Sequence, residues 1–199
     1  MKKLLNIHGG NVLVNVTKSY LDIARSVTRT KIGTKDESVE IDEALFGLMS
    51  CNYVYSYSAL LSFCSAQLYI LWDAEHSTLK ARYSKFESFE KLMSSELRSV
   101  KTALKVLIEE LNLKPLHSEE PKLWQNLTEL LKNYRDFFLH PNPEKFHEHV
   151  ESAGNKSWGL ASSTVEGILS YIFLNTSGNV PSWVFKSELE CDGFRLVDI

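Results

Sequence analysis

Two side chains near residue 140 have types and spacing that suit phosphate chemistry. In the segment YRDFFLHP, residues 134–141, Arg135 precedes His140 by five positions, and Pro141 follows directly. Histidine titrates near neutral pH and can move protons, whereas arginine stays charged and its planar fork fits phosphate oxygens. Metal-free cleavage of RNA needs a base for the 2′-hydroxyl proton and a cation for the charge on the phosphorane. His140 suits the first task and Arg135 the second.

Polar neighbours of the pair could complete a site. Asp136 lies four residues before His140, on its side of a helix, and could orient the imidazole. Lys132 and Asn133 could extend a track for phosphate groups, and His147 could flank a cleft near His140. We therefore expect Asp136 to act with the catalytic pair, and the other three side chains to bind substrate.

The helix that carries these residues is predicted over 122–139. Its apolar stripe consists of Trp124, Leu127, Leu130, Leu131, Tyr134, Phe137 and Phe138. On a helical wheel Arg135 falls at the rim of this stripe, and His140 falls roughly 140° further round, so one regular helix could not bring both to one phosphate. Either the turn before Pro141 deforms, because proline disfavours helical geometry in the residue before it, or a second molecule completes the site.

The order Arg135, polar Asp136, three apolar residues and His140 resembles the R-x4-6-H motif of HEPN domains. Members of that superfamily are all-α bundles, and many are metal-independent RNases of toxin–antitoxin, CRISPR and RNA-decay systems. Their motifs face each other across a dimer. The resemblance implies an endoribonuclease without cofactor or metal, acting on RNA as a homodimer, with an antitoxin protein as a possible partner.

Other interpretations remain open. A HEPN-like module could bind RNA or a nucleotide, or act as an adaptor, without catalysis. In an unrelated bundle, Arg135 would pair with a carboxylate and His140 would bind the last carbonyls of its helix. A metal site at His140, His147 and His149 is disfavoured, because helical residues two apart point about 160° away from each other.

Composition limits the class of protein. The 199 residues suit a single domain, 1–199, and the net charge of −3 with a pI near 6.1 argues against a strongly basic surface for duplex DNA. No P-loop, glycine-rich dinucleotide turn or paired CxxC motif occurs in the sequence. Cys51 and Cys64 fall on one predicted helix about 20 Å apart, too far for a disulfide. With no targeting segment in MKKLLNIHGG, we expect a cytoplasmic protein.

Apolar periodicity predicts an up-and-down bundle of about five or six helices. The predicted ranges are 12–28, 41–75, 79–111, 122–139, 143–151 and 158–174, with a loop over 112–121. In the third, a regular stripe from Leu79 to Leu111 indicates one long helix, so that two long central helices lie antiparallel. Gly178 suits a left-handed cap after the sixth helix, and 180–199 reads as a small C-terminal β-hairpin.

The stretch from Ala44 to Trp72 carries no formal charge and is long enough to span a bilayer. Serine hydroxyls and side-chain amides, however, occur on every face of the predicted helix. Such a helix suits burial in protein better than contact with lipid, and we expect no membrane association. Its aromatic residues, including Tyr53 and Tyr57, have the helical spacing of core residues.

Overall fold

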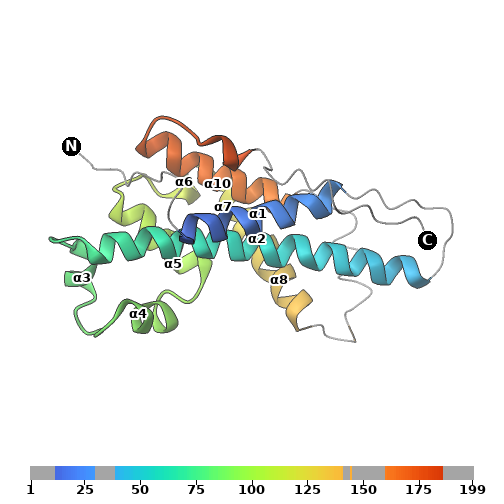
Figure 1. Ribbon diagram of the computed structural model, residues 1–199, viewed down its shortest axis with the longest axis horizontal. Coiled ribbons are helices and arrows are strands. Elements are labelled where there is room, and N and C mark those ends of the chain that lie inside the picture. The colour runs from blue at the N-terminus through green and yellow to red at the C-terminus, as the bar shows by residue number, and fades with distance from the viewer. Residues whose placement is uncertain (1–11, 30–38, 141–143, 145–159, 186–199) are drawn as a thin grey trace.

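The chain is built around one long helix in the computed structural model, which describes residues 12–29, 39–140, 144 and 160–185. Helix α2 (Val39–Asp73) has 35 residues and runs along the molecule (Figure 1), a length of about 52 Å. Helices α1 (Val12–Arg29), α8 (Lys132–Leu139) and α10 (Leu160–Thr176) pack against it. The described residues contain helices and no strand, so the all-α class is confirmed.

Five short helices follow α2 in the chain, and the first three of them pack against it. In chain order they are α3 (Thr78–Arg82), α4 (Phe89–Ser95), α5 (Val100–Glu110), α6 (Leu116–Glu119) and α7 (Pro121–Gln125). Helix α6 lies inside the predicted loop 112–121, where it buries Leu116 in the core. The fold therefore has one long helix with shorter helices around it, and the prediction of two long central helices is wrong.

The predicted third helix, 79–111, is observed as α3, α4 and α5, and a serine caps the start of each of the three. Ser77, Ser88 and Ser99 each have extended backbone before a helix, and their hydroxyls accept the N–H three residues on at 2.9, 3.3 and 3.2 Å. A serine N-cap satisfies an amide that the first helical turn leaves unpaired, so each serine favours a new start. The stripe was right about burial, since Leu92 and Leu104 are fully buried.

The predicted helix 122–139 is observed as a continuous helical run over Pro121–Leu139. Pro121 begins the run at a first-turn position, where its missing N–H has no helical partner to lose. After α7 the chain forms the π-helix η1 (Asn126–Leu131) and then α8. Gly167 of α10 lets α10 approach α7 closely, because a Cβ at this position would lie 2.8 Å from Cδ2 of Leu123 on α7.

Burial of α2 agrees with the polar residues in its sequence. Ser58 and Ser65 donate to the carbonyls of Val54 and Leu61, both at 2.8 Å, so these hydroxyls are satisfied within the helix. Among the described helices, only α2 has the length and hydropathy of a membrane span, over Met49–Asp73. In the most apolar part of this segment, 50% is buried in the fold. A core helix passes the same test. Cys51 and Cys64 are free thiols on this helix.

A buried arginine ties the segment after α10 to α1. Arg25 donates from Nε to Glu166 Oε1 at 2.7 Å and from Nη1 to the Trp183 carbonyl at 3.1 Å, and its Nη2 bonds the Val184 carbonyl. Asp22 adds a contact at 3.4 Å. Residues 25 and 22 are 5% and 1% exposed, so this is an interior polar network between segments distant in sequence.

The chain after α10 departs in part from expectation. Gly178 has the predicted left-handed conformation, with φ of 73°. The segment Ser182–Val184, where the first hairpin strand was expected, forms the 3-10 helix η3 instead. Pro181 before it fixes φ near the value of a helical turn. The β-hairpin is thus not seen over 180–185, and residues 186–199, like the predicted helix 143–151 apart from Glu144, lie outside the described residues.

Candidate functional site

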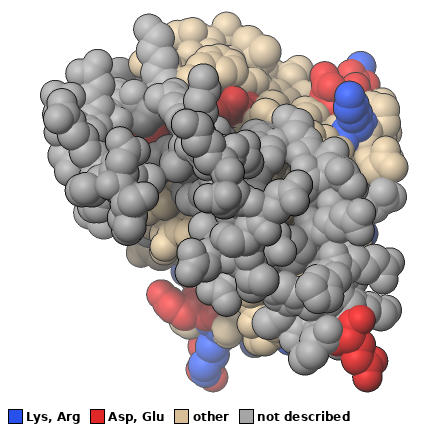
Figure 2. Space-filling model, turned by 90° about the vertical axis from the view of Figure 1, so that its right-hand side faces the viewer, with Lys and Arg blue, Asp and Glu red and all other residues tan. Residues whose placement is uncertain are grey.

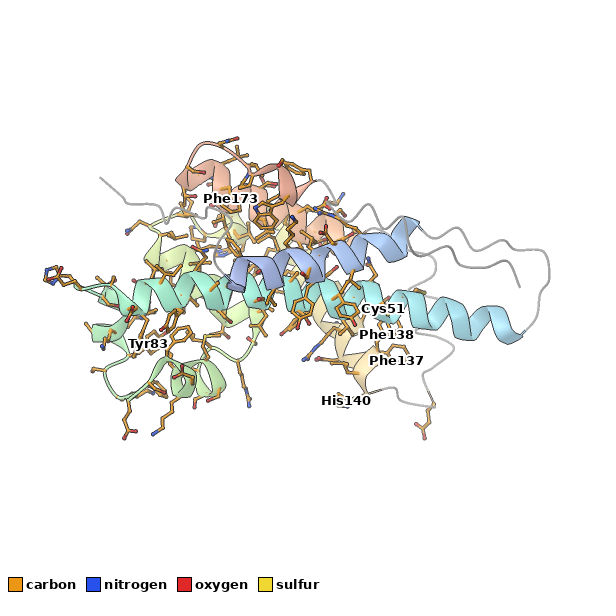
Figure 3. All side chains as sticks on the ribbon, viewed as in Figure 1. Cys51, Tyr83, Phe137, Phe138, His140 and Phe173 are labelled. Carbon is orange, nitrogen blue, oxygen red and sulfur yellow. The ribbon has the colours of Figure 1, made fainter. Side chains whose placement is uncertain are left out.

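An aromatic cluster holds α8 against α2. Tyr134, Phe137 and Phe138 are each 7% exposed. The Tyr53 ring of α2 lies 5.2 Å from that of Tyr134 and 5.7 Å from that of Phe138, measured between centroids. Figure 3 places Phe137, Phe138 and Cys51 in one region, where α8 meets α2. Tilted aromatic pairs at these distances are favourable beyond their buried area, so the helix that carries the motif is firmly seated.

Arg135 lies at the edge of this cluster. Its guanidinium carbon is 4.7 Å from the centroid of the Tyr57 ring, and its Nη1 pairs with Asp136 Oδ1. The Arg135 side chain is 33% exposed, so part of it is accessible from solvent. The Tyr57 hydroxyl in turn accepts the Val100 N–H at 3.2 Å. A ring fixed in this way positions the cation by a cation–π contact.

His140 ends α8 and leaves helical geometry. Its φ of −137° and ψ of 68° are not helical, although its N–H still donates to the Asp136 carbonyl at 2.9 Å. The change occurs directly before Pro141, as the sequence predicted. His140 is exposed at the tip of α8 (Figure 3), beside Leu139, whose exposure is 43%.

The polar neighbours are placed unevenly. The Asp136 carboxylate pairs with Arg135, while its backbone carbonyl makes the link to His140. Asn133 is exposed on α8. The side chain of Lys132 and the whole of His147 lie outside the described part of the chain. The arrangement thus contains one held cation and one exposed imidazole on a single helix end.

Tyr57 and Tyr53 belong to the site, although the sequence indicated only core roles for them. They lie one helical turn apart on the same face of α2 and meet α8 with successive rings. Burial raises the pKa of Tyr53 to about 12, and Tyr134 adds to the shift. The four-residue spacing of Tyr53 and Tyr57 predicted that both lie on one face of a helix. The sequence does not predict which other helix packs against this face.

The described residues do not contain three His, Cys, Asp or Glu side chains grouped as metal ligands. Of the histidines weighed for metal binding, His147 and His149 lie outside those residues. On the face in Figure 2, the described basic side chains that are visible lie next to acidic ones in small groups. The full sequence has a net charge of −3.

The chain matches no protein-family model, no curated protein and no solved structure. Geometry and chemistry at the end of α8 are therefore the basis for assigning a function.

Proposed function

We propose that this protein is a HEPN-like, metal-independent endoribonuclease whose active site forms where two copies bring Arg135 and His140 together. The observation that carries the proposal is the contrast between the buried face of α8 and the two accessible side chains of its motif. One face of the helix is buried, while the partly exposed Arg135 is fixed on Tyr57 and His140 projects from the tip. A positioned cation and an accessible imidazole are the two groups that RNA cleavage without metal requires.

In this mechanism His140 removes the 2′-hydroxyl proton, and the 2′-oxygen attacks the adjacent phosphorus. Arg135 stabilises the charge that develops on the phosphorane oxygens. Asp136 holds the guanidinium through its ion pair. The bond between phosphorus and the 5′-oxygen breaks, and this oxygen takes a proton from water, so that one product ends in a 2′,3′-cyclic phosphate and the other begins with a 5′-hydroxyl. His140 then returns its proton to solvent.

A two-fold dimer would complete the site. Leu139 is an exposed apolar side chain beside His140, at the tip of α8, where a second copy would dock. Two-fold contacts are self-complementary, so the same patch from both copies can meet. The cation of one protomer would then work beside the imidazole of its partner.

The cleavage test uses the full chain, a mixed RNA substrate and EDTA. Arg135→Ala and His140→Ala should each abolish cleavage. The control variants Arg98→Ala and His76→Ala, which replace exposed residues of the same types, should leave cleavage intact. If wild-type protein cuts no RNA, or if His140→Ala cuts as well as wild type, the enzymatic proposal is wrong.

Mixed dimers test the composite site directly. A dimer of one Arg135→Ala and one His140→Ala protomer retains one intact pair only if the two groups come from different protomers. Random mixing gives such dimers in half of cases, each with one of two sites, so about a quarter of wild-type activity should return. If each site lies within one protomer, mixing restores nothing.

Two contacts of Arg135 favour a second function. Arg135 already pairs with Asp136 and stacks on Tyr57, as a structural or ligand-binding arginine would. In that case the protein would be a non-catalytic RNA-binding or adaptor module of the same fold. It would bind RNA without cutting it, and Arg135→Ala would weaken the binding. An antitoxin protein as partner belongs to the nuclease proposal.

A further inference from the structure

A cavity of about 270 Å³ is lined by residues of α5, α6, α7 and the segment between α5 and α6. Figure 1 shows α5, α6 and α7 away from the tip of α8. Most of its wall is apolar and consists of Ile108, Leu113, Pro115, Leu116 and Trp124. Neither residue of the proposed nuclease pair lines it. Concave, mainly apolar sites with a few polar groups are typical of small-molecule binding, and this volume is near the small end of their range.

The walls of this cavity are fixed by the backbone. Asn112, at φ of 51°, ends α5 in the left-handed conformation, and the Leu113 N–H returns to the Ile108 carbonyl at 3.0 Å. Lys114, the next residue, is fixed by a hydrogen bond from α10, in which the Tyr171 hydroxyl donates to the Lys114 carbonyl at 2.6 Å. The cavity is thus preformed, which lowers the entropic cost of binding a ligand.

Charge at the rim is positive. Lys101 and Lys105 lie one helical turn apart on α5, and both are exposed. Glu109 also lines the cavity, but Arg82 pairs with it at 3.0 Å and Lys105 approaches it at 4.0 Å. Since a cation from outside the cavity already pairs with the carboxylate, the two lysines leave a net positive field for an anion.

Trp124 supplies a flat surface beside these charges. The Lys101 ammonium lies 5.6 Å from the centroid of the Trp124 ring, and the His117 ring lies 6.0 Å from it. No carboxylate among the described residues pairs with Lys101. A phosphate could therefore bind this ammonium without breaking an ion pair, while an aromatic ring packs against the indole and the aliphatic wall.

We propose that this cavity binds a small anion with a flat ring, of the class of a nucleoside monophosphate. The ring would pack on Trp124, and the phosphate would bind Lys101 and Lys105. The site is separate from the proposed nuclease site, and its occupant is a free nucleotide, because the cavity is too small for an oligonucleotide.

The test is calorimetric titration of the full chain with AMP, in the absence of RNA. AMP should bind saturably and more tightly than adenosine or inorganic phosphate alone, because each contains half of the recognised groups. The double variant Lys101→Gln, Lys105→Gln should weaken AMP binding at least about fivefold, as expected for two partly exposed charge contacts. Trp124→Leu should also weaken it, with circular dichroism to confirm that the variant is folded.

Lys80→Gln is the matched control, since Lys80 is another exposed lysine that lies 5.9 Å from a tryptophan ring, that of Trp72, outside this cavity. Its AMP affinity should equal that of wild type. The proposal is wrong if AMP does not saturate at millimolar concentration, if adenosine binds as tightly as AMP, or if the double lysine variant binds like wild type. None of these results depends on whether the protein cuts RNA.

Discussion

The guanidinium carbon of Arg135 on α8 lies 4.7 Å from the ring centroid of Tyr57 on α2, and the hydroxyl of the same tyrosine accepts the Val100 N–H at the start of α5. One side chain thus joins three helices. It presents its face to the cation of the motif and its oxygen to a helix end. The position of Arg135 therefore depends on core packing as well as on its own helix.

Substitution of Tyr57 separates its two contacts. Tyr57→Phe keeps the ring and loses the hydrogen bond, so it should lower the free energy of unfolding by about 1 kcal/mol and leave RNA cleavage intact. Tyr57→Leu removes the ring face and should slow cleavage about tenfold or more, because the cation loses its support. Single-turnover cleavage rates and urea denaturation measure the two effects. Equal cleavage rates for both variants would show that the ring does not position Arg135.

Two leucines eight residues apart in the helical run Pro121–Leu139 offer a matched test of which face of the run is buried. Leu131 is 1% exposed and Leu139 is 43% exposed. Leu131→Ala should lower the free energy of unfolding by about 2–5 kcal/mol, whereas Leu139→Ala should change it by less than about 0.5 kcal/mol. Urea denaturation measures both. A large loss of monomer stability from Leu139→Ala would contradict the described packing of α8.

Removing the buried arginine should destabilise the fold strongly. Arg25→Ala leaves Glu166, Asp22 and two backbone carbonyls without this partner, so we expect a loss of about 3–5 kcal/mol. Amide hydrogen exchange over 182–185 should rise as well, because the segment loses its link to α1. If exchange there stays at the wild-type rate, Arg25 does not hold that segment.

Stability should fall at high pH because of Tyr53. Burial raises the pKa of this side chain from 10.0 to about 12, with a further contribution from Tyr134. Between these pH values the unfolded tyrosine ionises while the native one keeps its proton, so the free energy of unfolding falls as pH rises through this window. Tyr53→Phe should show a fall that is shallower by at most about 2–3 kcal/mol over the whole window, and by about half of that between about pH 9 and about pH 11. Urea denaturation at about pH 9 and about pH 11 gives the comparison, and parallel curves for both proteins would contradict it.

The two longest apolar helices were located from local signals, namely the long uncharged stretch that forms α2, and the loop before and the glycine after α10. Helix α2 was predicted at 41–75 and is observed at Val39–Asp73, and α10 was predicted at 158–174 and is observed at Leu160–Thr176. The stripe over 79–111 found the buried residues but not the helix ends. Serine caps such as Ser88 and Ser99 are local competitors that periodicity does not detect.

The candidate site was predictable only where its cause is local. Pro141 follows His140 directly, and the departure of His140 from helical geometry was expected from that pair alone. The contact between Arg135 and Tyr57 joins two helices, and the Arg25 network joins α1 to residues near the end of the chain. Neither spacing nor composition predicts which distant faces meet.

The π-helix η1 makes the phase of α8 depend on a single residue. Asn126–Leu131 is more widely wound than the α-helices on either side, so the run contains one residue more than a regular helix of the same path. If the same residues were wound as a regular α-helix, everything after η1 would be rotated by about 100° about the helix axis. Arg135 would then leave Tyr57, and the rings of α8 would turn away from α2. The wide turn of η1 therefore keeps α8 in phase with α7, and deletion of one residue within η1 would leave the site facing α2. Deletion of one residue between η1 and Arg135 would instead turn Arg135 away from Tyr57, although none of the reacting groups would have changed.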